Sequence, residues 1–560
     1  MAATPVTPAL CEPIRVLIID DAESDRLKAQ EVLEASGVRV QMEFANDFDD
    51  ASDLVLRKFF DVVVVDLVLH DLPPGPRETW EGLWVLQELI DKDFADDTLV
   101  VVLTRFGTIE IAIDAFTKFK ATDFWDKAKP VSELVDSLKR ALERKSYFGL
   151  ASDVTFEPAT LGWEQLIDNL RQQPHKLSSS FVPADAETEL RHLLRRFFCD
   201  AESIRVSLMQ PGASAASVLR ITPYLGVQRQ QADVVVKYGP LKEIRTEERG
   251  WRKIQGFIGG HKATRLERMV LGRQLAAVEY TFVGAKLHEV VPFAKYYGAE
   301  SVENITRTLH GLFLETCGLW YGQMTAIGSG DANLSDAYGS YLGFSKSNIQ
   351  SAFGLKYPEQ PLSREEVRFA ALPRPLLHPI ARFCSGKADF CWPTSFCLTH
   401  GDLHVRNILV DRSTRDGWLI DFGRTDIGHW ARDFVELEAS IKFQLNQSSD
   451  LAALFEFEDA LASAESLNEE LKFERDDMPE LQKAFDCIQA IRRIAGQVAS
   501  KVDSKAAMLD YYAGLFYQTI NYVRLYRLLK PAQRKNHVLI SAALVLKRID
   551  SLQRTTSTGA

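Results

Sequence analysis

The sequence predicts an α/β fold at its N-terminal end, a doubly wound parallel sheet, and behind it a two-lobed α+β region with a helical C-terminal lobe. Three observations predict this organisation. Short apolar strands alternate with amphipathic helices over residues 12–147, mostly strands follow over 190–285, and helical patterns dominate 286–550. The 560 residues are too many for a single core.

The N-terminal region has four apolar runs of strand length with helical patterns between them. The predicted strands are Ile14 to Ile19, Asp61 to Val65, Leu99 to Leu103 and Thr122 to Trp125. The predicted helices are Ser24 to Ala35, Trp84 to Ile90 and Val131 to Arg144. This alternation predicts a parallel sheet with helices on both of its faces.

The next two segments differ in texture. Over residues 148–189, Pro158, Pro174 and Pro183 interrupt long elements and predict a connector with one short helix. Residues 190–285 predict a mostly antiparallel sheet packed against one helix. The expected strands there are 203–209, 217–222, 233–236, 265–271 and 275–283, and the packed helix is 243–258. A short helix over 187–198 precedes these strands, and the short helix of the connector is 163–171.

The composition excludes several classes of protein. Hydrophobic residues make up 46% and charged residues 26%, as in soluble globular domains. The formal net charge of −11 argues against a nucleic-acid binder. The first residues lack a signal-peptide pattern, no run approaches the roughly 18 apolar residues of a membrane helix, and the seven cysteines lack metal-site spacing. We expect a cytoplasmic protein that binds neither nucleic acid nor membrane.

Polar side chains follow the ends of the predicted N-terminal strands. Asp20 and Asp21 follow the first strand, Asp66 follows a later one, Thr104 ends the next and Lys127 follows the last. Because the carboxyl ends of parallel strands meet at one edge of a sheet, we expect these five side chains on one rim. Crowded carboxylates repel one another unless a cation neutralises them, and oxygen ligands suit Mg2+.

This pattern resembles the response-regulator receiver domain, a flavodoxin-like fold, over about residues 14–147. The resemblance implies that Asp66 accepts a phosphoryl group and holds Mg2+ together with the two aspartates after the first strand. It implies that Thr104 hydrogen-bonds the phosphoryl oxygens, that Lys127 pairs with them, and that Phe124 is the aromatic switch residue. An upstream histidine kinase or phosphotransfer protein is the implied partner, together with a homodimer through the receiver.

Some residues depart from the receiver pattern. The family has lysine directly before proline, where this chain has Lys129, so Lys129 stays an alternative to Lys127. Arg105 follows Thr104 where the family has a small residue, and a bulky cation there would slow loss of the phosphoryl group or block access of a phosphatase. The alternative function for this domain is docking or dimerisation without phosphorylation.

The most specific string in the chain is HGDLHVRN at 400–407, followed by DFG at 421–423. Phosphoryl transfer from ATP needs a carboxylate that orients the attacking hydroxyl and metal ligands that bridge the phosphates. Asp402, Asn407 and Asp421 supply these groups at the required spacing.

The segment resembles the aminoglycoside-phosphotransferase and choline-kinase group of protein-kinase-like folds. The resemblance implies that Asp402 is the catalytic base, that Asn407 and Asp421 bind Mg2+, and that Asp433 braces the catalytic loop. It implies an N-lobe over 190–285 and a C-lobe over 286–550.

The N-lobe partners follow the same resemblance. Lys237 fits the strand lysine that grips the ATP phosphates, and Glu247 or Glu248 its ion-pair partner. Glu247 is preferred because Trp251 and Ile254 then repeat at helical spacing along the packed face. The hairpin loop 210–216 is the candidate phosphate cover, and the hinge between the lobes is expected near 282–285.

Together these features predict a response regulator, phosphorylated on Asp66, that controls an ATP- and Mg2+-dependent phosphotransferase acting on a hydroxyl of a small-molecule substrate. The alternative is a signalling scaffold whose kinase-like module binds nucleotide or a partner without turnover. Protein kinase activity is disfavoured, because Gly401 and His404 replace the usual Arg and Lys of the catalytic loop and no activation segment follows Asp421.

Overall fold

The computed structural model describes residues 13–70, 80–92, 94, 98–105, 108–144, 153–171, 177, 181–210, 216–225, 229–257, 264–282, 289–322, 324–326, 332–525 and 534–557. The chain divides into two compact units. The first unit is Met1–Arg245 with Leu266–Thr281, and the second unit is Thr246–Arg265 with Phe282–Ala560. None of the helices in the described ranges is both long enough and apolar enough to cross a membrane.

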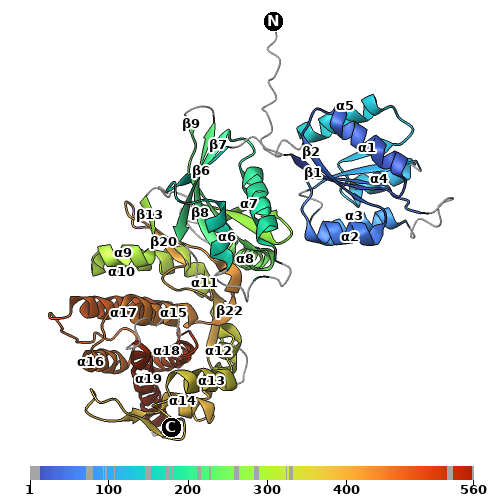
Figure 1. The fold of residues 1–560 in the computed structure, drawn as a ribbon. Helices are drawn as coiled ribbons and strands as arrows, with labels where there is room; N and C mark the ends of the chain where they lie inside the picture. The colour runs from blue at the N-terminus through green and yellow to red at the C-terminus, as the bar shows by residue number, and fades with distance from the viewer. Residues whose placement is uncertain are drawn as a thin grey trace. The chain divides into compact units, whose positions relative to one another are not determined.

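The first unit begins with a five-stranded parallel sheet in the order β2-β1-β3-β4-β5, with helices on both faces (Figure 1). The strands are β1 (Ile14–Ile19), β2 (Val40–Ala45), β3 (Val62–Val65), β4 (Leu99–Thr104) and β5 (Asp123–Asp126). The helices are α1 (Glu23–Ala35), α2 (Phe48–Arg57), α3 (Glu81–Asp91), α4 (Ile109–Thr117) and α5 (Val131–Arg144). The predicted doubly wound parallel sheet is confirmed.

Successive side chains of the central strands enter two different cores, because side chains of a strand alternate between its faces. Val63 and Val65 pack with α2, α3 and α4, whereas Val62 and Val64 pack with α1 and α5. Strands buried on both faces are continuous apolar runs in sequence, and these were predicted. The edge strand β2 was not, because only its last residue is buried.

A mixed sheet follows in the first unit, in the order β11-β12-β10-β8-β7-β6, with β9 paired to β8. Its strands are β6 (Asp153–Glu157), β7 (Ser203–Gln210), β8 (Ser217–Leu225), β9 (Arg229–Gln230), β10 (Val234–Pro240), β11 (Thr264–Leu271) and β12 (Leu275–Phe282). The helices beside it in the chain are α6 (Trp163–Arg171), α7 (Pro183–Phe197) and α8 (Leu241–Ile254).

The segment predicted as a connector contributes to this sheet. Within 148–189 the structure has β6, which pairs parallel with β7, and α6, whose apolar side joins the core under the sheet. The helix expected at 187–198 begins earlier, at Pro183, since proline is well tolerated in the first turn of a helix. Proline-rich composition therefore marked the ends of elements here and not an unpacked linker.

Arg273, in the turn between β11 and β12, contacts the parallel-sheet part of the same unit. Its Nε–H donates to the carbonyls of Val55 and Lys58, the latter at 3.1 Å. Its guanidinium lies 3.5 Å from the centre of the Phe94 ring, a cation–π contact. Leu241, at the start of α8, packs against the core under α2, α3 and α4. The two sheets of the first unit are thus joined by a buried side chain.

The second unit is mainly helical. Its helices are α9 (Phe293–Ala299), α10 (Val302–His310), α11 (Gly318–Gly322), α12 (Leu334–Leu342), α13 (Lys346–Lys356), α14 (Pro379–Cys384), α15 (Arg432–Ser440), α16 (Leu451–Ala462), α17 (Pro479–Val498), α18 (Ser504–Asn521) and α19 (Arg534–Ser557). Its short strands are β13 (Val290–Pro292), β14 (Thr325–Ala326), β15 (Ala332–Asn333), β16 (Glu366–Val367), β17 (Leu376–Leu377), β18 (Cys391–Trp392), β19 (Ser395–Thr399), β20 (Ile408–Asp411), β21 (Gly417–Leu419) and β22 (Asp426–His429).

A buried ionic network ties the helices of the second unit together. Glu438 of α15 receives the guanidinium of Arg492 from α17 at 2.8 Å and the ammonium of Lys442 at 2.9 Å. Lys442 also pairs with Glu458 of α16 at 2.9 Å, and Glu458 meets His537 of α19 at 2.7 Å. Burial alone would raise the pKa of Glu438, but Arg492 and Lys442 lower it to about 2. Each charge has a partner, which is the condition for burying charges at tolerable cost.

Candidate functional site

The rim of the parallel sheet gathers the predicted carboxylates. One ligand atom from each of Asp20, Asp21 and Asp66 lies within 4.8 Å of the other two. The ammonium of Lys127 lies 2.6 Å from Asp66 and 2.6 Å from Asp20. Three carboxylates at this spacing offer the hard oxygen ligands that Mg2+ prefers, so the residues present fit the predicted ion.

Burial sets the electrostatics of this pocket. It raises the pKa of Asp20 to about 6, against the opposing effect of Lys127. Burial also raises the pKa of Asp66, which is opposed by Lys127 and by a hydrogen bond from Thr104. Burial works against the charged form of Lys127, but Asp66, Asp20 and Asp25 outweigh it and raise the pKa of Lys127. The pocket therefore favours added positive charge.

Gly82 lets α3 approach the strand that carries Asp66. A Cβ atom at Gly82 would lie 2.0 Å from the carbonyl oxygen of Asp66 and 2.6 Å from the Cα of Leu67. Those distances are far below van der Waals contact, so only glycine fits here without a backbone shift.

In the second unit, the residues around Asp402 form a loop whose backbone is hydrogen-bonded to Asp433 of α15. The two carboxylate oxygens of Asp433 accept the N–H groups of His400 at 2.8 Å and Gly401 at 2.9 Å. Asn407 donates from Nδ2 to the carbonyl of Asp402 at 2.8 Å. Gly401 has φ +80°, and a Cβ there would lie 2.2 Å from a carbonyl oxygen, which explains glycine at this position.

The Asp421-Phe422-Gly423 segment contacts α8 within the same unit. Glu247 accepts the N–H of Phe422 at 2.8 Å, and Trp251 lies against the Phe422 ring at 5.3 Å between centroids. A Cβ on Gly250 would lie 1.7 Å from the carbonyl oxygen of Phe422. Asp421 itself has φ +72°, an uncommon conformation for a residue with a side chain.

Charged groups flank Asp402. His404 Nε2 lies 3.9 Å and Arg424 Nη1 3.7 Å from its carboxylate oxygens. Glu436 of α15 is buried, and burial together with the charge of Asp402 raises its pKa well above the usual range. Sequence reasoning missed Arg424 and Glu436, although Arg424 directly follows the predicted metal-ligand motif.

A family model described as the response regulator receiver domain matches residues 16–139. The N-terminal part of this chain is a receiver domain.

One curated relative is the C4-dicarboxylate transport transcriptional regulatory protein DctD of Pseudomonas aeruginosa. This chain is 32% identical to it over 132 residues, which are 23% of this chain and 25% of that protein. The chain thus spans about a quarter of the length of this relative.

Solved receiver structures are also similar to part of this chain. The non-phosphorylated HemR receiver domain of Leptospira biflexa is 25% identical, with 23% of this chain and 94% of that chain covered at a TM-score of 0.20. The chemotaxis response regulator CheY4 of Vibrio cholerae is 21% identical, with 23% and 100% covered at a TM-score of 0.20.

A second family model, described as Ternary complex associated domain 9, matches residues 361–520. This range contains the loop around Asp402 and the bracing Asp433.

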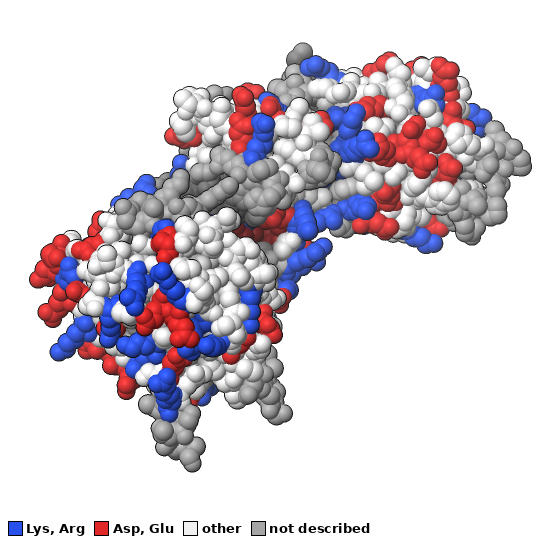
Figure 2. Space-filling model, turned by 60° about the horizontal axis from the view of Figure 1, so that its bottom comes forward, with Lys and Arg blue, Asp and Glu red and all other residues white. Residues whose placement is uncertain are grey.

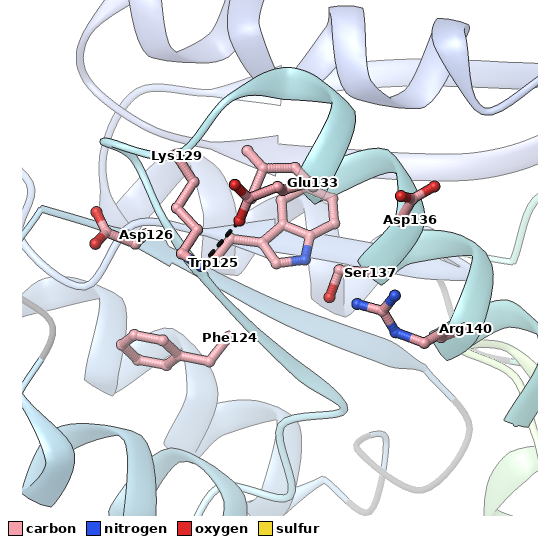
Figure 3. A pocket seen from close by; sticks show the side chains of 9 residues that line it. Phe124, Trp125, Asp126, Lys129, Glu133, Asp136, Ser137 and Arg140 are labelled. Atoms are coloured by element: carbon pink, nitrogen blue, oxygen red, sulfur yellow. Dashed lines mark hydrogen bonds and ion pairs between the residues drawn. The ribbon is translucent and has the colours of Figure 1, made fainter.

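Within the receiver, the structure distinguishes the two candidate lysines. Lys129 is exposed and pairs with Glu133 of α5 at 2.9 Å, whereas Lys127 enters the acidic pocket. A hollow of about 350 Å3 lies beside β5 and is lined by Lys129, Glu133 and Phe124, the predicted switch residue, among others. Figure 3 shows these side chains, with the ion pair between Lys129 and Glu133 as a dashed line. Phe124 is half-buried against the core under α4.

Sequence reasoning missed Asp25 of α1. Its Oδ2 lies 2.9 Å from the ammonium of Lys127 and 2.7 Å from Nη2 of Arg105. Lys127 and Arg105 are 102 and 80 residues away in the chain, so no local spacing could reveal the contact. The only sequence signal was the departure at Arg105 itself.

The predicted nucleotide-binding residues are described in part. Lys237 lies on β10 of the first unit, 4% exposed, and Glu247 lies in the second unit, 1% exposed. Glu248 pairs with Arg252 one turn along α8, so Glu247 and not Glu248 faces the protein interior. The phosphate-cover loop at 211–215 and the hinge at 283–285 lie outside the described residues.

Proposed function

We propose that this protein is a response regulator in which phosphorylation of Asp66 controls an ATP- and Mg2+-dependent phosphotransferase built from residues 190–550. The receiver would take its phosphoryl group from an upstream histidine kinase or phosphotransfer protein. The phosphotransferase would pass the terminal phosphoryl group of ATP to a hydroxyl of a small molecule.

The receiver supports the first step through its charge arrangement. A carboxylate attacks phosphorus only where positive charge offsets its own charge and that of the phosphoryl group. Lys127 stands 2.6 Å from Asp66, and Asp20 and Asp21 would hold Mg2+ beside it. Thr104 ends β4 at the same rim, where its hydroxyl would meet a phosphoryl oxygen.

The observation that carries the second step is the hydrogen-bonded loop around Asp402. Asn407 donates a hydrogen bond to the carbonyl of Asp402, and Asp433 accepts the N–H groups of the two residues before Asp402. A base that orients a hydroxyl must be held in place, and this loop would hold Asp402 while Asn407 and Asp421 bind Mg2+.

Coupling between the two steps is supported by the contacts of Arg273. This residue lies at the end of the sheet that carries Lys237 and contacts the receiver at Val55, Lys58 and Phe94. A change of receiver conformation that extends from the rim to this end of the domain would be passed to the proposed ATP-binding sheet.

A scaffold without turnover is the second candidate. The matched family is described as ternary-complex associated, which favours a role in assembly for residues 361–520. In this case the kinase-like module would bind nucleotide or a partner, and Asp402 would have no chemical role.

The proposed partners follow from surface chemistry. Ile109, Ile113 and Phe116 lie exposed at helical spacing on α4. Exposed apolar residues that lie together favour a contact with another protein, and we propose a homodimer through the receiver. The mass of the protein in solution tests this proposal. Figure 2 shows basic side chains lying among acidic ones on one face of the protein. Nucleic acid is not among the proposed partners.

The test is phosphate incorporation by the full-length protein with acetyl phosphate and Mg2+, comparing wild type with Asp66→Asn, while ATP turnover is followed in the same samples. We expect an acid-labile label that Asp66→Asn loses, and ATP turnover that changes with the label and disappears in Asp402→Asn. Label without turnover, in protein shown to be folded, would favour the scaffold. Absence of label from wild type would contradict the receiver step.

A further inference from the structure

Asp25 and Arg105 form an ion pair at the mouth of the acidic pocket. A single oxygen of Asp25, Oδ2, lies 2.7 Å from Nη2 of Arg105 and 2.9 Å from Nζ of Lys127. The side chain of Asp25 is 11% exposed, that of Lys127 is 4% exposed and that of Arg105 is 55% exposed. The pair therefore lies between the buried pocket and solvent.

Lys127 is shared by three carboxylates in this state. Its ammonium contacts Asp66 and Asp20 at 2.6 Å each in addition to Asp25. Because attraction between charges falls with distance, a cation so placed is held by all three at once. A phosphoryl group on Asp66 would add about one further negative charge and three acceptor oxygens, which compete for the same ammonium.

Asp25 holds Lys127 back from the phosphoryl oxygens unless another cation pairs with Asp25. If Lys127 turns toward the phosphoryl oxygens, Asp25 would keep a partly buried, unpaired charge, which is costly. Arg105 supplies the replacement, since it already contacts the oxygen of Asp25 that faces Lys127.

We propose that Asp25 and Arg105 are positioning residues that set the stability of the phosphorylated receiver: Arg105 holds Asp25 and thereby releases Lys127 to the phosphoryl group. The proposal rests on phosphorylation of Asp66 as proposed above. In that step an oxygen of Asp66 bonds to phosphorus as the donor's bond to phosphorus breaks, a P–N bond in a phosphohistidine donor and a P–O bond in acetyl phosphate. In hydrolysis, the oxygen of water bonds to phosphorus, the Asp66–phosphorus bond breaks, and the protons of water leave with the phosphate.

The experiment measures two quantities on the full-length protein. One is the affinity for beryllofluoride with Mg2+, a phosphoryl mimic, by calorimetry. The other is the half-life of the acid-labile label introduced by acetyl phosphate. The variants are Arg105→Gln, Asp25→Asn and the double variant, and Lys129→Gln removes one exposed positive charge from the same domain as a control.

Arg105→Gln should weaken beryllofluoride binding and shorten the half-life by about five- to tenfold, the scale of a partly buried charge pair. Asp25→Asn should change both in the opposite direction. The double variant should match Asp25→Asn and so lose the defect of Arg105→Gln, because Arg105 acts through Asp25. Thermal unfolding of each variant checks the fold, and a purely structural role would not give this rescue.

The outcomes separate the two proposals. No label on wild type contradicts phosphorylation of Asp66 itself. A label on wild type with unchanged half-lives in the variants, with a longer half-life in Arg105→Gln, or with no rescue in the double variant, overturns the positioning role.

Discussion

Asp433 has no chemical role in the proposed reaction, yet its two oxygens fix the backbone on which the reaction depends. Both accept an N–H of the loop, from His400 and Gly401, and the carboxylate is fully buried. Such an interaction is expensive to remove, because each orphaned N–H keeps its desolvation penalty.

Asp433→Ala should lower the free energy of unfolding of the second unit by about 2–4 kcal/mol, since two buried N–H groups lose their acceptor. Urea denaturation of the full-length protein measures the change. Asp459→Ala, at an exposed position of α16, is the control and should stay within about 0.5 kcal/mol of wild type. Equal midpoints for the two variants would refute this account of Asp433.

At the scale of the helix, the space around a glycine decides whether a residue with a side chain would fit there. Gly250 allows α8 to contact the backbone of Phe422, where a Cβ would come within 1.7 Å of its carbonyl oxygen. Gly256 follows the same helix with nothing within 4 Å of a Cβ. A Cβ would therefore clash at Gly250 and meet open space at Gly256.

Gly250→Ala should destabilise the second unit by about 1–3 kcal/mol through overpacking and should lower ATP turnover, because Glu247 and Phe422 separate. Thermal unfolding and ATP turnover of the same preparation measure both effects. Gly256→Ala should leave both unchanged, and a loss in this variant equal to that of Gly250→Ala would contradict the packing argument.

The charge network joining α15 to its neighbours makes stability depend on pH. The pKa of Glu438 is lowered to about 2 from an ordinary value of 4.5, so the folded state binds its proton less readily than the unfolded chain. The contribution is therefore fully present above pH 4.5 and is lost as the pH falls toward 2.

Glu438→Gln should cost about 3–5 kcal/mol at pH 7, because Arg492 and Lys442 lose a buried partner, and should flatten the fall in stability below pH 4.5. Urea midpoints from pH 3 to 7 measure both. Glu456→Gln, at an exposed glutamate of α16, is the control. A Glu438→Gln protein whose stability falls with acid as steeply as wild type would exclude this carboxylate as the source.

At the scale of the whole molecule, the receiver and the mixed sheet of the first unit share the contacts of Arg273. Arg273 is 7% exposed as a residue, and its guanidinium faces the Phe94 ring and the end of α2. This end of the parallel sheet is opposite to the rim that carries Asp66, since Val55 and Lys58 precede β3 and Asp66 follows it. The receiver thus carries its acidic pocket and its contact with the mixed sheet at different ends.

Arg273→Ala should loosen the receiver from the mixed sheet without disturbing the acidic pocket. We expect faster hydrogen exchange around residues 54–60, with beryllofluoride affinity within about twofold of wild type and a weaker effect of Asp66 phosphorylation on ATP turnover. Arg265→Ala, at an exposed position of β11, is the matched control. Unchanged exchange in Arg273→Ala would show that this contact does not hold the two sheets together.

The sequence by itself determined the parallel sheet and the identity of its acidic rim. Strand period and chain order place Asp20, Asp21 and Asp66 at one edge, because carboxyl ends of parallel strands converge. The edge strand β2 and the strand β6 within the predicted connector were not predicted, because neither is a continuous apolar run.

Only the tertiary structure decided which side chains complete the rim. The sequence already named Lys127, with Lys129 as the alternative, and Lys127 lies in the pocket. The contact of Asp25 with Lys127 and Arg105, across 102 and 80 residues of chain, had no such signal. Such contacts depend on how each helix is rotated against the sheet, which the packing of its buried side fixes and which no local spacing encodes.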